Sequence, residues 1–267
     1  MSGARRFEDR VALVTGAASG IGRATALRLA SEGASVGVVD RDASGAEQTV
    51  RALEAAGAKA AAFACDVSQS AAVERTLAAL EGTLGAVDVL ANVAGIGDTA
   101  GFGGIQEVTD ERWSKILAVN LTGPFLLCRA ILPGMAARGR GAVVNVSSLA
   151  GRSKSANAGP AYSASKAGLL GLTRHLAFDY ARRGVRVNAI CPGGVDTPMI
   201  RGGQFRPHSS EDPEDRRKRL EAYRWFMPIQ RLSTPEEQAA AIAFLASDDA
   251  SYINGVALDV NGGLYMA

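Results

Sequence analysis

Short apolar runs alternate along the chain with longer segments in which apolar residues recur at every third or fourth position. The runs are almost continuously apolar, which is typical of parallel strands that helices cover on both faces. Alternation of strands and helices predicts right-handed crossovers and an α/β fold with one doubly wound parallel sheet. We expect strands at residues 11–15, 35–39, 60–64, 87–91, 142–146, 185–190 and 256–260. No repeat or linker interrupts this pattern, which predicts a single domain over residues 1–267.

The segment 199–227 departs from this rhythm because it has no strand pattern and is dense in charge. Acidic residues come first and basic residues follow, which is the order that a helix dipole favours. The pattern is typical of a solvated helix face. Its position before the last crossover helix also makes it a candidate flap over a ligand site.

Composition and charge narrow the class of protein. The chain has 29 Lys and Arg against 27 Asp and Glu, which gives a net charge of +2, and it is 47% hydrophobic. This balance excludes a disordered chain and predicts neither a nucleic acid nor a membrane surface as partner. We also expect no transmembrane helix, because no apolar run approaches the roughly 18 residues that span a bilayer.

The cysteines, the histidines and the N-terminus bear on compartment and metals. The three cysteines are far apart and match neither a disulfide framework nor metal-ligand spacing, which favours a reducing compartment. The basic N-terminus has no apolar stretch behind it and therefore does not form a secretory signal. Two histidines are too few for a zinc site. We expect a cytoplasmic protein without a metal centre.

A glycine-rich turn follows the first expected strand and opens a helix. Gly16, Gly20 and Gly22 do not fit the G-x-G-x-x-G spacing, but the physical demand on the turn is the same. The backbone must turn sharply, approach a pyrophosphate closely and present helix N-terminal amides to its charge. Glycines also occur in strand–helix turns that bind nothing, so the turn alone leaves both interpretations open.

Asp40 ends the second expected strand, about 20 residues further on, where a carboxylate can accept hydrogen bonds from an adenosine ribose. The same carboxylate would repel a 2′-phosphate, and Ser19 in the turn is uncharged. These features favour NAD over NADP. Arg41 and Arg23 favour the opposite, since either could reach a phosphate. Without a ligand, Asp40 would be a helix cap.

Tyr162 and Lys166 lie four residues apart in a strongly helical stretch and therefore share one helix face. A free phenol has a pKa of about 10 and is a poor base at neutral pH. A nearby ammonium favours the phenolate, and lowering the pKa by about three units requires about 4 kcal/mol. Such a phenol can pass protons in both directions. This spacing is also common by chance, and the bland alternative is a structural tyrosine and a solvated lysine.

Ser147 and Ser148 end the fifth expected strand. Ligands of doubly wound sheets bind at the carboxyl ends of the strands, where a serine can hydrogen-bond the oxygen that Tyr162 protonates or deprotonates. Successive side chains of a strand point to opposite faces, so only one of the two serines can serve. We expect Ser148. The alternative is that both serines cap the next segment.

Six segments occur in register along the chain: Thr15-Gly16-x-x-x-Gly20-Ile21-Gly22, Asn92-Val93-Ala94-Gly95, Asn120, Ser148, Tyr162-x-x-x-Lys166 and Pro192-Gly193. Together they resemble the short-chain dehydrogenase/reductase family in its compact subgroup. The resemblance runs from about residue 10 to residue 263, nearly the whole chain. It implies a Rossmann fold, a nicotinamide cofactor and a homotetramer with contacts through the helix of Tyr162 and residues 255–267.

The resemblance implies a role for each catalytic position. Ser148 would orient the substrate, and Tyr162 would act as the general acid/base. Lys166 would hold the nicotinamide ribose and lower the pKa of Tyr162. Asn120 would anchor a water that connects Lys166 with solvent.

The resemblance also implies the cofactor contacts. Ile21 would meet the pyrophosphate, while Asp66 and Val67 would contact the adenine. Val195 and Thr197 would bind the carboxamide, and the segment after the fourth strand would brace the sheet beside the cofactor. The expected contacts are Gly16, Ser19, Gly20, Ile21, Gly22, Asp40, Arg41, Asp66, Val67, Asn92, Ala94, Gly95, Tyr162, Lys166, Pro192, Gly193, Val195 and Thr197.

The sequence departs from the family pattern at two places. Val93 stands where the family usually has a second asparagine, which removes a side-chain hydrogen bond but keeps Asn92. The spacing from Ser148 to Tyr162 is one residue longer than is common in the family. We assign the extra residue to the loop 152–160, and Ser147 is the alternative to Ser148.

We therefore expect an NAD-dependent oxidoreductase that transfers a hydride between nicotinamide and a secondary alcohol or ketone, with Tyr162 as general acid/base. The alternative enzyme is an NADPH-linked 3-oxoacyl-thioester (acyl-carrier-protein) reductase, in which Arg23 or Arg41 would hold the 2′-phosphate. A catalytically silent dinucleotide-binding protein is the other alternative. It would be marked by loss of a catalytic position, and all four are present.

We expect the substrate to meet three segments: the loop after Ser148, residues 96–104 and the candidate flap. Arg152 and Lys154 could recognise a carboxylate, phosphate or sulfonate, or could face water. Apolar flap residues could instead cover an apolar alcohol, or could belong to the core or to a subunit contact. The residues in question are Ala156 and Asn157 in the loop, and Trp225, Phe226 and Met227 in the flap.

Overall fold

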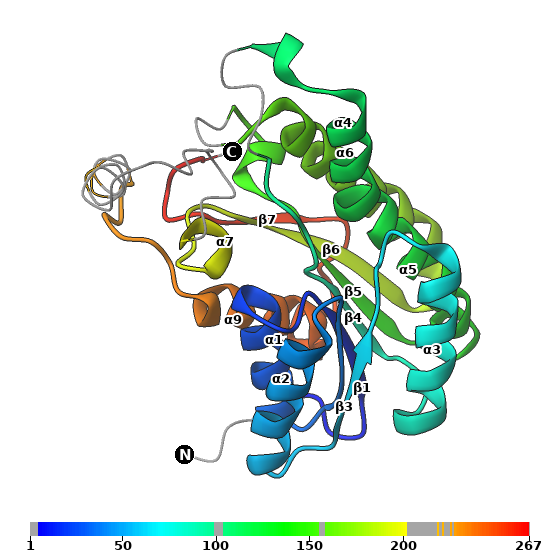
Figure 1. Cartoon of the computed structure of the whole chain (residues 1–267). Coiled ribbons are helices and arrows are strands. Elements are labelled where there is room, and N and C mark those ends of the chain that lie inside the picture. The colour runs from blue at the N-terminus through cyan, green and yellow to red at the C-terminus, as the bar shows by residue number, and fades with distance from the viewer. Residues whose placement is uncertain are drawn as a thin grey trace.

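The structure, a computed structural model, describes residues 5–98, 104–154, 158–201 and 227–266 and the isolated positions 218, 221 and 225. Its centre is a seven-stranded parallel sheet (Figure 1). The strand order β3-β2-β1-β4-β5-β6-β7 shows that the chain winds outward in both directions from the boundary between β1 and β4. The strands are β1 Val11–Thr15, β2 Ser35–Asp40, β3 Ala60–Ala64, β4 Val89–Asn92, β5 Gly141–Val146, β6 Val185–Pro192 and β7 Ala257–Val260. The predicted doubly wound parallel sheet is confirmed.

Helices cover both faces of the sheet (Figure 1). One face carries α1 Gly20–Ser31, α2 Ala43–Ala55 and α9 Pro235–Ala246, and the other carries α3 Ser70–Leu84, α5 Gly123–Ala137 and α6 Pro160–Tyr180. Helix α4 Asp110–Leu117 packs on α6, and the short helix α7 Pro198–Arg201 follows β6. This two-sided cover explains why the strands read as continuous apolar runs.

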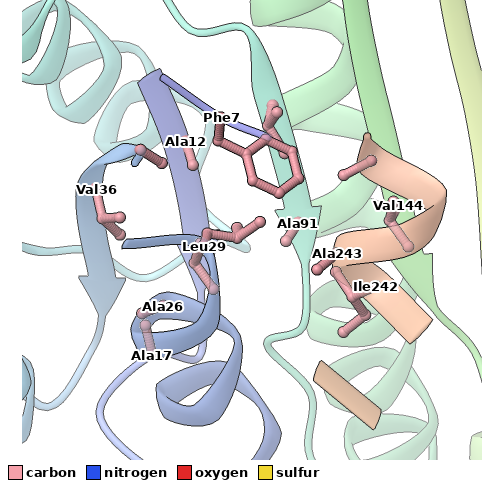
Figure 2. Packing of buried hydrophobic residues seen from close by; sticks show 14 of the residues in the cluster. Phe7, Ala12, Ala17, Ala26, Leu29, Val36, Ala91, Val144, Ile242 and Ala243 are labelled. Atoms are coloured by element: carbon pink, nitrogen blue, oxygen red, sulfur yellow. The ribbon is translucent and has the colours of Figure 1, made fainter. Parts of the chain in front are cut away.

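Alternate residues of β1 enter two separate hydrophobic clusters. Ala12 and Val14 pack in one cluster with Leu29 of α1 and Ile242 of α9 (Figure 2). Leu13 belongs to the second cluster, which lies against α3 and α5. Leu13, Leu29 and Ile242 are fully buried, and each such side chain contributes roughly 1.5–3 kcal/mol. The strand is thus buried on both faces, and its carboxyl end is held rigidly where the glycine turn begins.

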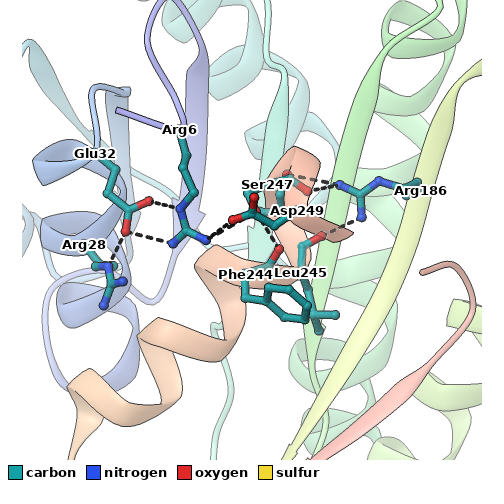
Figure 3. Close-up of polar contacts among 9 residues, drawn as sticks. Arg6, Arg28, Glu32, Arg186, Phe244, Leu245, Ser247 and Asp249 are labelled. Carbon is teal, nitrogen blue, oxygen red and sulfur yellow. Dashed lines mark hydrogen bonds and ion pairs between the residues drawn. The ribbon is translucent and has the colours of Figure 1, made fainter. Parts of the chain in front are cut away.

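A network of arginines ties the N-terminal segment to the C-terminal ends of α1 and α9 (Figure 3). Arg6 donates to both carboxylate oxygens of Glu32 at 2.6 and 2.9 Å and to Asp249 at 2.9 Å. Arg186 donates to the carbonyl oxygens of residues 245–247, which end helix α9. Arg186 thus satisfies carbonyls that a helix C-terminus leaves without partners. The network lies at the edge opposite the ends of the strands that form the cleft described below.

The boundaries of five strands differ from the expected ones by one or two residues, and the largest shifts are in β4 and β6. Strand β4 starts at Val89 rather than at residue 87, and before it the Asp88 carboxylate accepts the N–H of Val11 at 3.2 Å. Strand β6 continues to Pro192 because its last residues pair with β7. Most of the candidate flap 199–227 lies outside the described residues, and its described part begins with α7.

One helical run corrects the expectation about apolar segments. Within the described residues, Asp110–Ala137 is long and apolar enough to cross a membrane by length and composition, with a mean hydropathy of 1.6 in its best window. No uninterrupted apolar run of this length occurs in the chain. The average over the window is still apolar, because the residues that interrupt it at the junction of α4 and α5 are small and uncharged. Half of the window is buried inside the protein, as in a core helix.

Candidate active site

A cleft of about 430 Å³ opens at the carboxyl ends of the strands, where the strand order reverses between β1 and β4. Doubly wound sheets bind their ligands at this topological switch point. The loops after β1, β2, β3 and β4 line the cleft, together with the start of α7. The cleft brings together Gly16, Ser19, Gly20, Ile21, Gly22, Asp40, Arg41, Asp66, Val67, Ala94, Gly95 and Thr197.

The glycine turn packs too tightly to accommodate side chains. Gly16 has a φ of +65°, and a Cβ there would lie 2.8 Å from the Cα of Ala94. A Cβ on Gly22 would overlap the carbonyl oxygen of Gly16. Helix α1 begins at Gly20, and its N-cap Ser19 makes no side-chain hydrogen bond to the helix. The first amides of α1 therefore have no side-chain cap at the cleft, which suits a pyrophosphate.

The Asp40 carboxylate fixes the glycine turn and does not cap a helix. One of its oxygens accepts the N–H of Ala18 and the other accepts the N–H of Asp42, each at 3.0 Å. The cap of α2 is Asp42, which accepts the N–H of Gly45 at 3.1 Å. The carboxylate of Asp40 thus has a defined position in the cleft, where hydroxyl groups of a ribose would find an acceptor.

The two arginines near Asp40 differ in position. Arg41 is exposed and lines the cleft, whereas Arg23 is exposed outside the cleft lining. On the next loop, Ser68 donates its N–H at 3.0 Å and its hydroxyl at 2.7 Å to Asp66. Val67 is buried beside it. The loop after β3, where the resemblance implies contacts with adenine, is therefore held in a fixed position at the cleft.

Tyr162 lies near the start of α6 and is only 7% exposed. Its phenol is hydrogen-bonded to the side chain of Ser148, which also accepts the N–H of Ala150 at 3.1 Å. Ser147 turns away and donates to the carbonyl oxygen of Lys166 at 2.8 Å. The structure places Ser148, and not Ser147, at the phenol, as alternation along β5 requires.

Lys166 lies one turn further along α6 and is 4% exposed. Its Nζ donates to the carbonyl oxygen of Val146 at 2.8 Å and lies 5.6 Å from the centroid of the Tyr162 ring. Burial lowers the pKa of Lys166 to about 8. Burial also raises the pKa of Tyr162 to about 12, against the hydrogen bond from Ser148. Desolvation therefore outweighs the hydrogen bond at the phenol, and the lowering of its pKa by Lys166 stays a prediction.

Asn120 lies in a π-helical turn, Ala118–Thr122, between α4 and α5, and such turns are frequent at functional sites. Its Oδ1 accepts the N–H of Ile96 at 2.8 Å. Its Nδ2 donates to the carbonyl oxygen of Ile96 at 3.0 Å and to Ser165 at 3.3 Å. The amide group thus pins the loop after β4 to α6, and both of its N–H groups are used.

Asn92 lies outside the cleft lining and acts within the core. Its Nδ2 donates to Asn145 of β5 at 2.8 Å, and Asn145 donates to Thr173 of α6 at 2.9 Å. All three side chains are buried. This chain of hydrogen bonds joins β4, β5 and α6, and it fixes the strand of Ser148 against the helix of Tyr162.

The turn after β6 closes the cleft from the other side. A Cβ on Gly193 would lie 2.9 Å from the carbonyl oxygen of Asn261, so this turn packs on the C-terminal segment. Val195 is buried, and Thr197 donates to its carbonyl oxygen at 3.4 Å. The methyl group of Thr197 faces Gly20, since a Cβ on that glycine would lie 3.3 Å from it. The turn therefore holds Thr197 across from the start of α1.

The two cations after Ser148 behave differently. Arg152 donates to Asp259 of β7 at 3.0 Å, and its guanidinium lies 5.0 Å from the centroid of the Tyr265 ring. Lys154 is exposed and makes no hydrogen bond or ion pair with the described residues. The remaining loop positions considered, Ala156 and Asn157, lie outside the described residues.

The apolar residues expected near the substrate differ in their exposure. Met227 is 2% exposed and belongs to the interior, whereas Trp225 is 77% exposed. Ile96 lines the cleft beside the bonds from Asn120. Phe226 and residues 99–103 lie outside the described residues.

Thr15 and Lys115 were not among the expected site residues. Thr15 accepts the N–H groups of Val93 and Ala94 at 3.0 and 3.1 Å and so holds the loop after β4 against β1. Its place immediately before Gly16 was the available signal. Lys115 reaches the cleft from α4, and a single exposed lysine on an amphipathic helix gives no signal in the sequence.

The residues present fit a dinucleotide. They offer an uncapped helix N-terminus, a carboxylate at the end of β2 and a buried tyrosine and lysine. In the part of the chain that the structure describes, no three His, Cys, Asp or Glu side chains are arranged to hold a metal ion. This geometry is that of a nicotinamide-dependent oxidoreductase.

The comparisons with known proteins agree with this class. A family model described as enoyl-(acyl carrier protein) reductase matches residues 16–265. The chain is 43% identical to cis-4-hydroxycyclohexanecarboxylate dehydrogenase of Sinomonas cyclohexanicum, over 96% of this chain and 97% of that protein. It is 40% identical to 2-(S)-hydroxypropyl-CoM dehydrogenase 3 of Xanthobacter autotrophicus, over 97% and 98%. The crystal structure of levodione reductase superposes with a TM-score of 0.89 at 39% identity, covering 97% and 98%.

The chain belongs to the short-chain dehydrogenase/reductase family. It is an oxidoreductase that acts on CH–OH groups, as the resemblance of its motifs implied.

Proposed function

We propose that the protein uses NAD to interconvert a secondary alcohol and its ketone. The observation that carries the cofactor preference is the Asp40 carboxylate, which lines the cleft and is held by two backbone N–H groups. A carboxylate in this position accepts hydrogen bonds from a ribose and repels a 2′-phosphate. Relatives named for hydroxypropyl-CoM, a hydroxycyclohexanecarboxylate and levodione support an alcohol or ketone as substrate.

The chain's own residues would bind the cofactor along the cleft. The amides at the start of α1 would hold the pyrophosphate, Asp40 the adenosine ribose, and Lys166 the nicotinamide ribose. When bound, the oxidised cofactor supplies a hydride acceptor and a positive charge. Val195 and Thr197 would fix the orientation of the carboxamide.

Proton transfer is the work of Tyr162. In the direction of oxidation its phenolate takes the hydroxyl proton of the substrate, and in reduction its phenol returns a proton to the carbonyl oxygen. Ser148, which is hydrogen-bonded to the phenol, can donate to the same oxygen. Because burial raises the pKa of Tyr162 to about 12, the phenolate forms only with positive charge close by. The Lys166 ammonium, 5.6 Å from the ring centroid, provides part of that charge.

Replacing Asp40 tests the cofactor preference. Asp40→Ala should weaken NAD binding by about tenfold or more, since hydrogen bonds to a charged group contribute about 1.5–3 kcal/mol. NADP binding should improve because the repulsion is removed. The measurement is the Kd of each cofactor by fluorescence titration.

The control for this test is Asp40→Asn, which keeps an oxygen for the glycine turn but removes the charge. It should also improve NADP binding, with a smaller loss for NAD. If neither variant changed the ratio of the two affinities, the proposal for NAD would fail. A wild-type preference for NADP would instead favour the NADPH-linked 3-oxoacyl-thioester reductase.

We also propose that the chain forms a homotetramer. Phe178 of α6 is 86% exposed and Phe125 of α5 is 42% exposed, and large apolar side chains on a surface favour protein contacts. Tyr252 and Met266, at 102% and 78% exposed, support contacts near the C-terminal region. Light scattering should give four times the chain mass of 27.6 kDa, and a stable monomer would contradict this. Phe178→Glu should shift the mass downward.

A cytoplasmic location is part of the proposal. The three cysteines are buried and unpaired, and burial raises the pKa of Cys128 to about 12 and that of Cys191 to about 11. Unpaired thiols of this kind are usual in reducing compartments.

A further inference from the structure

The ion pair between Arg152 and Asp259 joins the catalytic serine turn to the C-terminal segment. Arg152 directly follows the 3₁₀ turn Leu149–Gly151, whose N-cap is Ser148. Asp259 lies on β7 opposite Cys191 of β6. Both ends of the pair are therefore at the carboxyl edge of the sheet.

The carboxyl edge is the side of the sheet on which doubly wound folds bind ligands, and Arg152 lies there directly after the turn of Ser148. Cys191 precedes the turn that packs on the C-terminal segment, with Gly193 against Asn261. The charges of Arg152 and Asp259 and hydrogen bonds with the serine turn all act on the pKa of the Cys191 thiol. Burial raises its pKa to about 11, Asp259 adds to the rise, and Arg152 opposes it together with hydrogen bonds to Ser147 and the Ser148 backbone. The pair therefore lies beside the serine turn, since Asp259 is opposite Cys191 in the sheet and Arg152 follows Leu149–Gly151.

The pair makes only one of the two hydrogen bonds of a bidentate ion pair. It has one hydrogen bond, from Nη2 of Arg152 to Oδ2 of Asp259 at 3.0 Å. Nε of Arg152 and Oδ1 of Asp259 are buried and have no hydrogen-bond partner within the described chain. An arginine and a carboxylate that formed the bidentate fork would use all four atoms. The Tyr265 ring, 5.0 Å from the guanidinium, covers its face.

The net charge at this ion pair depends on Asp259. A guanidinium released from its carboxylate partner is well suited to a carboxylate or sulfonate on a substrate. Asp259 neutralises that cation and supplies a carboxylate of its own. An anionic group of a substrate that reached this ion pair would meet a guanidinium that is already paired and a carboxylate that repels it.

We propose that Asp259 is a specificity-determining residue, which holds Arg152 and so restricts this end of the site to alcohols and ketones without an anionic group. The inference rests on the proposed function for its substrates. This chain would therefore take the uncharged class of substrate.

The test compares cyclohexanol with cis-4-hydroxycyclohexanecarboxylate in wild type, in Asp259→Asn and in Asp259→Asn with Arg152→Gln. In Asp259→Asn, the ratio of kcat/KM for the carboxylate to that for cyclohexanol should rise at least about tenfold, as expected when a charged hydrogen bond is gained. In the double variant the ratio should fall back to near the wild-type value, because the gain acts through Arg152. An unchanged ratio, or an equal rise in the double variant, would overturn the inference.

A binding measurement separates this inference from the proposed function. Calorimetric titration with cyclohexanecarboxylate in the presence of NAD should show at least about tenfold tighter binding to Asp259→Asn than to wild type. This result is expected even if wild type oxidises neither alcohol, in which case only the proposed function fails. Arg152→Gln is the second variant, should Asp259→Asn not fold. It leaves Asp259 unpaired, so binding of the carboxylate should weaken, and equal or tighter binding would overturn the inference.

Discussion

Tyr162→Phe should lower kcat by about 100- to 10,000-fold, because the variant loses the only group that transfers the substrate proton. The ring should keep its place, since Tyr162 packs with Ile116, Ala150 and Ala161 through its apolar body. Binding of NAD should therefore change little. Steady-state kinetics with an alcohol substrate and a fluorescence titration with NAD measure the two effects separately.

A matched control lies at the other end of the same helix. Tyr180 ends α6 and lies against the second hydrophobic cluster, away from the cleft lining. Tyr180→Phe should keep kcat within about threefold of wild type, in line with the small effect of most changes outside an active site. Substantial turnover by Tyr162→Phe would remove the phenol from its assigned role.

Lys166→Met should abolish turnover and at the same time stabilise the fold at pH 7. Burial lowers the pKa of Lys166 from 10.5 to about 8, so keeping the ammonium buried costs about 3 kcal/mol at neutral pH. Methionine removes this cost but loses the hydrogen bond to Val146, which contributes about 1 kcal/mol. The free energy of unfolding should rise by about 2 kcal/mol. Urea unfolding at pH 7 gives this number.

The pH dependence of the free energy of unfolding tests the direction of the pKa shift of Lys166. Between pH 8 and 10.5 the unfolded chain still binds a proton at Lys166 whereas the folded chain does not, so wild-type stability rises with pH in that window. The advantage of Lys166→Met should shrink over the same range. Measurements should stop below pH 10, since the raised pKa of Tyr162 lowers stability from there to about pH 12. Lys59→Met, at an exposed position, should show neither effect, and a variant at Lys166 that is less stable at pH 7 would contradict the account.

Features with local causes were predictable from the sequence. Continuous apolar runs revealed the buried parallel strands, and alternation along β5 indicated Ser148 rather than Ser147. The spacing of Tyr162 and Lys166 placed both on one helix face, and the structure holds both at the end of the sheet. These relations depend on one element or one turn, which the order of residues specifies.

Features that depend on distant segments were not predictable. Arg152 meets Asp259, which lies 107 residues further along, and no local pattern marks the pair. Asn92 was expected to brace the sheet beside the cofactor, but its bonding partner, Asn145, lies 53 residues away and could not be named from the sequence. The balance of pKa shifts at Tyr162 and Lys166 depends on burial, which the sequence does not quantify.

The most direct test of the central claim follows nicotinamide absorbance when wild-type protein meets a panel of secondary alcohols with NAD, in parallel with NADP and with Tyr162→Phe. The account predicts reduction of NAD by at least one alcohol, slower reduction of NADP, and almost no reduction with the variant. Turnover that is equally fast in Tyr162→Phe, or the absence of reaction with every alcohol and with the matching ketones under both cofactors, would contradict it.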